Sequence, residues 1–168
     1  MINPTVNELR KKNEAARDRI GRQLDGMAAH LDRSPAPGEW SARQVLCHLL
    51  LEPGFDAVAL LQCFAPRDLP VVEIVPGQVT VTPERARMTL AELIGGLDAQ
   101  RLEVFAYLET LDEAALGAKA RVPLFAPLVG TDEITLPMFV GVMFDRHWHA
   151  HADQLAQIRQ AAGLPEAT

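Results

Sequence analysis

The chain has 168 residues, of which 48% are apolar, enough for one domain with a single sizeable core. Its formal net charge of −6 argues against nucleic-acid binding, because phosphate recognition needs a dense basic surface. Only six Phe, two Trp and one Tyr are present, so aliphatic side chains must fill the interior, which suits packed helices. We therefore expect a single domain over residues 1–168.

No run approaches the roughly 18 apolar residues needed to cross a bilayer, and residues 1–22 contain no apolar stretch typical of a signal peptide. We expect no membrane partner and a cytoplasmic protein. Cys47 and Cys63 lie too far apart on one helical pattern to bond each other, which predicts free, buried thiols.

The first predicted helix covers residues 5–31, where apolar side chains recur at intervals of three, four and seven positions. The Pro- and Gly-rich stretch at residues 34–38 should end it. The second predicted helix, residues 41–64, begins with a capping box formed by Ser41 and Gln44.

Pro53-Gly54 interrupts the pattern of this second helix. A proline removes one main-chain hydrogen bond and presses on the preceding turn, so we expect a kink one turn after His48. Residues 66–81 then predict a short extended connection or a loose hairpin.

The third predicted helix covers residues 83–110, with possible N-terminal signals at Thr82-Pro83 and at Thr89-Leu90. A small hairpin around Gly130 should pair residues 122–128 with residues 133–136. The last predicted helix covers residues 137–161. Four long helices with one short crossover region predict an all-α four-helix bundle.

The last helix carries two histidines, His147 and His151, on one face at a spacing of four residues. They share that face with Val140 and Met143, so both should point inward. A neutral imidazole buried without a partner costs about 1–3 kcal/mol, and one metal ion would satisfy both rings. The pair therefore favours a metal site.

A third histidine, His48, lies on the inward side of the second helix, from where it can meet His147 and His151 in the core. Three imidazoles leave coordination positions open, as in catalytic metal sites. His149 is rotated about 200° from His147 and should face away. His30 reads as a solvated residue near the end of the first helix.

Glu52 follows His48 by one helical turn. It could be a fourth metal ligand, an acceptor that orients an imidazole, a catalytic base, or an exposed glutamate beside the kink. Trp40, just before the second helix, needs only a packing role as a hydrophobic staple.

These residues resemble the DinB/YfiT-like family of bacterial metal-binding four-helix bundles. The resemblance rests on Trp40-Ser41, on His48-Leu49, and on the motif His147-x-x-x-His151-x-x-Gln154-x-x-x-Ile158-Arg159. It implies an up-down-down-up bundle in which His48, His147 and His151 bind a divalent ion such as zinc or nickel. It also implies a homodimer. The sequence departs from the family pattern at Pro53-Gly54, where relatives continue a regular helix.

The resemblance further implies a reaction class. Characterised relatives include S-transferases and isomerases that use low-molecular-weight thiols such as bacillithiol or mycothiol, so a thiol S-transferase acting on a small molecule is the leading expectation. A metal could equally generate hydroxide for hydrolysis. A non-catalytic metal-binding stress-response module that acts through protein contacts is the alternative from another class.

Overall fold

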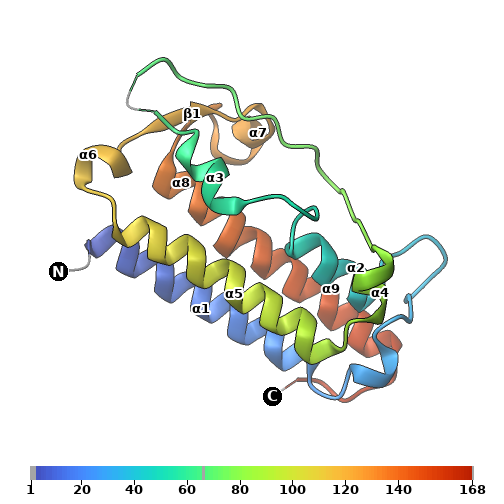
Figure 1. Ribbon diagram of the computed structural model, residues 1–168. Helices are drawn as coiled ribbons and strands as arrows, with labels where there is room; N and C mark the ends of the chain where they lie inside the picture. The colour runs from blue at the N-terminus through green and yellow to red at the C-terminus, as the bar shows by residue number, and fades with distance from the viewer. Residues whose placement is uncertain (1–2, 66, 168) are drawn as a thin grey trace.

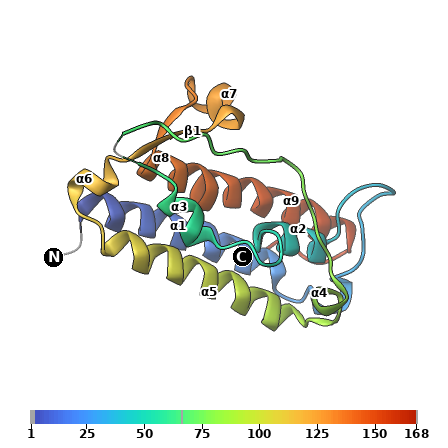
Figure 2. The ribbon, with the colours of Figure 1, turned by 45° about the horizontal axis from the view of Figure 1, so that its top comes forward.

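Four helical segments lie side by side in the computed structural model, which describes residues 3–65 and 67–167 (Figure 1). They are α1 (Pro4–Leu24), α2 (Ala42–Leu49), α5 (Leu90–Glu109) and a last helix made of α8 (Leu136–Gly141), a π-helical turn η3 (Val142–Arg146) and α9 (His147–Ala161). The first and last run one way, and α2 and α5 run the opposite way (Figures 1 and 2). The predicted all-α, up-down-down-up four-helix bundle is confirmed.

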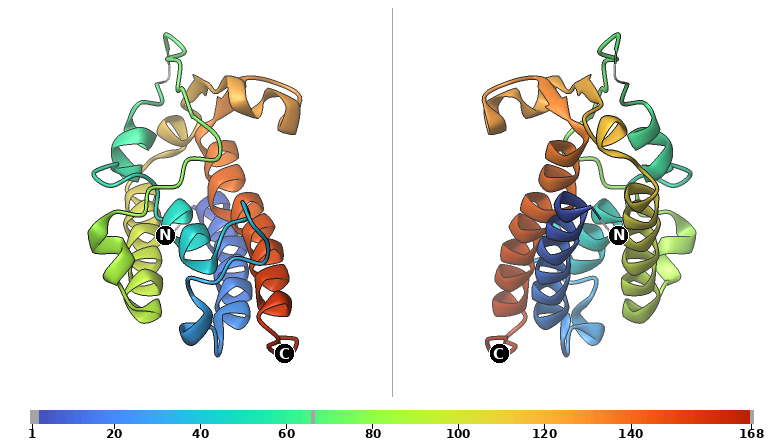
Figure 3. Two further views of the ribbon diagram at one scale, coloured as in Figure 1. Left: turned by 90° about the vertical axis from the view of Figure 1, so that its right-hand side faces the viewer. Right: turned by 90° about the vertical axis from the view of Figure 1, so that its left-hand side faces the viewer.

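The remaining elements are short. They are η1 (Ala28–His30), α3 (Ala57–Gln62), α4 (Pro83–Arg87), α6 (Glu113–Leu116), β1 (Lys119–Arg121), η2 (Pro123–Phe125), α7 (Ala126–Val129) and β2 (Glu133–Thr135). The hairpin and α7 gather at one end of the bundle (Figure 3).

The core lies between the four helical segments, each of which contributes fully buried aliphatic or aromatic side chains. They include Ile20 and Leu24 of α1, Val45, Leu46 and Leu49 of α2, Leu93, Leu97 and Leu108 of α5, and Trp148, Leu155 and Ile158 of α9. An ion pair ties α1 to α5, since the Arg17 guanidinium donates to both carboxylate oxygens of Asp98 at 2.8 Å. The guanidinium lowers the pKa of Asp98.

The first helix ends at Leu24, earlier than the predicted residue 31, and Gly26 follows with a φ of +73°. Buried Arg159 holds this end of α1: its guanidinium donates to the main-chain oxygens of Gln23, at 3.0 Å, and Asp25. The same guanidinium donates to Pro165 O at 2.6 Å. One side chain thus joins the end of α1 to the C-terminal turn.

The second predicted helix is divided into two, where a kink was expected. After α2 the chain turns through Leu51, with a φ of +62°, and Gly54, with a φ of +81°, before α3 begins. Side chains bind the carbonyl groups that the break releases. Gln100 Nε2 donates to Leu49 O at 3.0 Å, and Arg85 donates to Cys47 O at 3.2 Å.

The third predicted helix is also divided, because both N-terminal signals are used. Thr82 caps α4 and accepts from the Arg85 N–H, while Thr89 and Glu92 form a capping box on α5. Gly96 permits the close approach of α5 to the end of α2, since a Cβ there would lie 2.9 Å from Leu50 Cδ2.

The first strand of the hairpin lies earlier in the chain than predicted, and the second lies where it was predicted: β1 pairs antiparallel with β2, and Ala120 lies opposite Ile134. We call residues 67–82 the strap. Near its start, Val72 N–H donates to Arg121 O at 2.8 Å, and the strap then crosses in extended form to α4 (Figure 1). Of the two predicted alternatives, the extended connection is the one observed.

Neither cysteine forms a disulfide within the described chain, as expected, but only Cys47 is buried. The prediction of burial was wrong for Cys63, which follows the short α3 and is exposed because this helix lies at the edge of the core. No helix in the described residues combines the length and apolarity needed to cross a bilayer.

We predict that Arg159→Met lowers the free energy of unfolding by about 2–3 kcal/mol, because it removes charge-assisted hydrogen bonds from carbonyl groups at two chain segments. Urea denaturation followed by circular dichroism measures the change. The exposed Arg22→Met is the control, with an expected change within about 0.5 kcal/mol. Equal midpoints for the two variants would contradict the role given to Arg159.

Candidate metal centre

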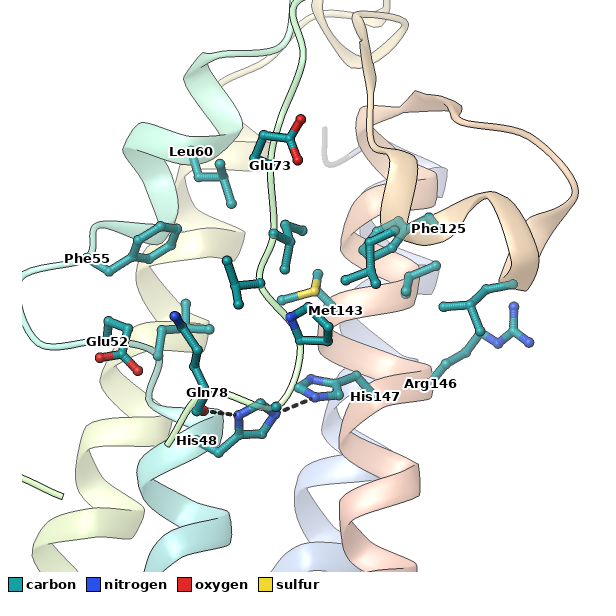
Figure 4. A pocket seen from close by; sticks show the side chains of 18 of the residues that line it. His48, Glu52, Phe55, Leu60, Glu73, Gln78, Phe125, Met143, Arg146 and His147 are labelled. Carbon is teal, nitrogen blue, oxygen red and sulfur yellow. Dashed lines mark hydrogen bonds between the residues drawn. The ribbon is translucent and has the colours of Figure 1, made fainter. Parts of the chain in front are cut away.

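Three histidines from two helical segments converge between α2 and α9. His48 Nε2 lies 2.9 Å from His147 Nε2 (Figure 4). His151 Nε2 lies 3.0 Å from the same atom of His147. One ligand atom from each of the three residues lies within 4.8 Å of the others. The structure therefore brings together all three histidines that the sequence singled out.

The other nitrogen of each ring faces a hydrogen-bond acceptor. His48 Nδ1 donates to Gln78 O at 2.6 Å, and His151 Nδ1 donates to Gln154 Oε1 at 2.8 Å. His147 hydrogen-bonds to the main chain of Met143. Because a main-chain oxygen can only accept, the neutral rings of His48 and His147 carry the proton on Nδ1 and expose the Nε2 lone pair. The Gln154 amide oxygen favours the same tautomer for His151.

Three Nε2 lone pairs that face one another repel unless a cation lies between them. Two nitrogens bound to one ion at about 2.0–2.1 Å can be at most about 4.2 Å apart, and the two Nε2 separations above meet this limit. Neutral imidazole donors suit zinc, nickel, copper and iron. The residues present therefore fit a divalent transition-metal ion.

Burial keeps the rings of His147 and His151 neutral. It lowers the pKa of His147 from 6.5 to about 3, and the neighbouring His151 and His48 lower this pKa as well. Burial also lowers the pKa of His151, although the Gln154 hydrogen bond opposes the shift. Both rings are unprotonated at neutral pH, which is the state that metal ligation requires.

The face on which the histidines lie differs from the predicted one because of the π-helical turn η3. Its defining bond runs from the His147 N–H to Val142 O, five residues back, so the turn holds one more residue than an α-helical turn. After it, Trp148 and Ala152 take the fully buried positions. His147 and His151 are only half-buried beside them.

His48 and His147 line a cavity of about 620 Å³ (Figure 4). Its walls come from the α2–α3 connection, α3, the strap, η2, α7 and the last helix. Most of the lining side chains are apolar, among them Leu51, Phe55, Leu60, Ile74, Phe125 and Leu128. Phe55 and Leu128 are about half exposed, at 47% and 54%, so the cavity has an apolar mouth.

Glu52 lines this cavity together with His48 and His147. Its carboxylate accepts a hydrogen bond from the Thr80 hydroxyl. Within the described residues, the metal-ligand cluster contains only the three histidines, and the acceptors that orient their rings are other groups. Two of the four interpretations of Glu52, a metal ligand and an orienting acceptor, are therefore not supported.

Sequence reasoning missed the partners of the histidines. The ring of Trp40, which needed only a packing role, stacks on His151 with a 6.0 Å centroid separation and a 9° interplanar angle. Gln154 follows His151 by three residues, a spacing that could have indicated its contact. The contacts to the main chain of Gln78 and Met143 could not be predicted from the sequence, because they do not depend on residue type.

The remaining histidines lie outside the cluster. His149 Nε2 lies 3.4 Å from Asp145 Oδ1, one turn away on the same helix. His30 ends the short η1. Neither belongs to the group of candidate metal ligands, in agreement with the prediction.

An up-down-down-up bundle with an internal three-histidine cluster beside a cavity defines a distinct class of helical bundle. A sequence profile described as the DinB superfamily matches residues 12–143, and the chain belongs to this superfamily. The matched region contains His48 and Glu52 and ends before His147.

A solved structure supports the same fold. YfiT from Bacillus subtilis, described as a probable metal-dependent hydrolase with an unusual four-helix bundle topology, aligns with a TM-score of 0.58. The alignment covers 98% of this chain and 92% of that chain, at 17% sequence identity. This level of identity shows the shared fold alone. No curated protein matches the chain.

We predict that His48→Ala, His147→Ala and His151→Ala each lower the metal content of the purified protein, because one ion would share the three rings. His149→Ala and His30→Ala are the controls and should retain it. Elemental analysis after dialysis gives the ratio of metal to protein. Helicity should survive in all five variants, since the core does not include the cluster. Full metal retention by the His147 and His151 variants would refute the site.

We also predict that the metal-free protein loses stability as the pH falls from about 6.5 towards 3. Between these values the unfolded chain binds a proton at residue 147 and the folded protein does not, so protons favour unfolding. Urea midpoints at several pH values measure the slope. His147→Gln removes this titration and should give a shallower dependence. An identical slope in this variant would contradict the assigned neutral ring.

Proposed function

We propose that the protein is a metal-dependent enzyme that acts on a small molecule with a largely apolar body. Its divalent ion, zinc or nickel, is held by His48, His147 and His151. The observation that carries this proposal is the position of the cluster: exposed Nε2 lone pairs border an apolar cavity of about 620 Å³. This volume matches that of small-molecule sites.

The ligand set favours an enzyme over a non-catalytic stress-response module that acts through protein contacts. A structural metal site is closed by four protein ligands, whereas a catalytic site leaves a position for the reacting molecule. The cluster holds three protein ligands within the described residues, and two of them line the cavity. A molecule in the cavity could therefore reach the open position.

The leading reaction is S-transfer from a low-molecular-weight thiol to an electrophile. A bound divalent ion would lower the pKa of a coordinated thiol. The three neutral rings add no negative charge to the centre and keep it strongly electrophilic. The apolar walls near Phe55 and Phe125 would hold the electrophile and exclude water from it. A bacillithiol- or mycothiol-like co-substrate is part of this proposal through the family resemblance.

Glu52 is the proposed proton acceptor. The Thr80 hydroxyl binds Oε2 of this carboxylate, and no described residue binds Oε1. Thr80 therefore fixes the orientation of the carboxylate and leaves one oxygen available. This oxygen would take the proton from the thiol or water that enters the cavity.

Hydrolysis is the second candidate reaction, favoured by the presence of Glu52 in the lining of the cavity. A carboxylate so placed could orient and deprotonate an attacking water. The description of YfiT as a probable metal-dependent hydrolase supports the same reaction class. A homodimer in a bacterial cytoplasm, as the family resemblance implies, belongs to the proposal as well.

Turnover by the metal-loaded protein tests the proposal. The protein is incubated with bacillithiol, mycothiol or cysteine and either monobromobimane or a chloro-dinitrobenzene, and in parallel with aryl esters. Conjugation that exceeds the rate with metal-free protein supports S-transfer, and ester cleavage supports hydrolysis. Equal rates for metal-loaded and metal-free protein with every substrate would overturn the enzymatic function.

We predict that Glu52→Gln lowers kcat by about 10²–10⁴-fold and leaves the metal content unchanged, because the amide cannot accept the proton. Steady-state kinetics and elemental analysis give the two numbers. Glu73→Gln is the matched control, since Glu73 lines the same cavity and is exposed. An unchanged kcat in the Glu52 variant would exclude Glu52 as the base.

A further inference from the structure

We infer that Asn13, on α1, is a positioning residue of the metal centre: it holds the π-helical turn that rotates His147 and His151 towards His48. This inference rests on the proposed metal binding. It assigns a role to a residue that lies on a different helix from every candidate ligand.

Asn13 is fully buried in the interface between α1 and the last helix. Its Nδ2 donates to Phe144 O at 2.7 Å, and Phe144 lies within the π-helical turn. No described residue donates to its Oδ1. The amide therefore makes one strong hydrogen bond, and this bond ends on the main chain three residues before His147.

Stability alone does not explain this amide. A buried polar atom without a partner is destabilising, and an apolar side chain of similar shape is often as stable or more so. The neighbouring core positions of α1 carry Val6, Ala16 and Ile20, as expected for such an interface. A single amide among these apolar side chains therefore indicates a role other than stabilising the helix interface.

The π-helical turn that Asn13 contacts determines which side chains of α9 face the core. Each helical residue turns the chain by about 100°, so one extra residue in a turn rotates the following helix by that amount relative to α8. In a regular helix, His147 and His151 would follow Leu136 and Val140 into the core. With the extra residue, Trp148 and Ala152 enter the core instead, and the histidines turn to the edge where His48 meets them.

Asn13 donates its hydrogen bond within the turn that contains the extra residue. A π-helical turn is rare because its hydrogen bonds are less favourable, and a side chain that inserts into the main-chain ladder can stabilise the distortion. The Phe144 carbonyl receives such a side-chain donor. The Phe144 ring lies 6.1 Å from the Trp148 ring, centroid to centroid, so the turn is packed directly against the residue that follows His147.

Two substitutions test the role of Asn13. Asn13→Leu removes the donor and keeps the branching of the side chain, and Asn13→Ala removes it without steric conflict. Ile20→Val is the matched control, a buried change on the same helix that keeps the hydrogen bond to Phe144. For each protein, Zn²⁺ affinity is measured by competition with a chromophoric chelator. The visible spectrum of the Co²⁺ form reports the ligand geometry, and urea denaturation of the metal-free form reports stability.

We expect both Asn13 variants to bind Zn²⁺ about 10–100-fold more weakly than the original protein and to give a changed Co²⁺ spectrum. The metal-free Asn13→Leu protein should be at least as stable as the original, so the loss of affinity is not a loss of folding. Ile20→Val should be less stable and bind Zn²⁺ with unchanged affinity.

The outcomes separate this inference from the function on which it rests. Zn²⁺ affinities and Co²⁺ spectra like those of the original protein in both Asn13 variants would overturn the inference alone. If Asn13→Leu does not fold, the Zn²⁺ affinity and Co²⁺ spectrum of the Asn13→Ala protein test the inference. An original protein that binds no Zn²⁺ would overturn the metal site and this inference with it.

Discussion

The proton on the Nδ1 atom of each clustered histidine is the constraint on which the site depends. Main-chain and amide oxygens accept these protons, so the Nε2 lone pairs meet at one point without a hydrogen between them. Burial opposes protonation of His147 and His151 and preserves this arrangement at neutral pH. The rest of the bundle supplies the two helical segments that hold the rings and the acceptors that fix their tautomers.

The bundle and the cavity come from different parts of the chain. Four packed helical segments form the core, and most of the cavity wall comes from the segments between them: the break after α2, the strap, and η2 with α7. The break contributes Leu51, Glu52 and Phe55 to the cavity wall.

The sequence predicted the elements that rest on local signals. The capping box at Ser41 and the three histidines could be recognised from residue type and spacing alone. The π-helical turn could not, because Val142, Met143 and Phe144 are all apolar and fit either helical register. The acceptors at Gln78 and Met143 were equally hidden, since every residue has a carbonyl group. The positive φ of Leu51 is a tertiary effect, for leucine has no preference for that conformation.

The strap connects the cavity to the histidine cluster, because it contacts both. Its Gln78 carbonyl orients His48, its Thr80 hydroxyl holds Glu52, and its central residues line the cavity. A molecule that contacts the strap therefore changes the free energy of the same segment that fixes a candidate metal ligand. Linkage is reciprocal, so if a molecule in the cavity changes the affinity of His48 for an ion, the ion would change the affinity for that molecule by the same factor.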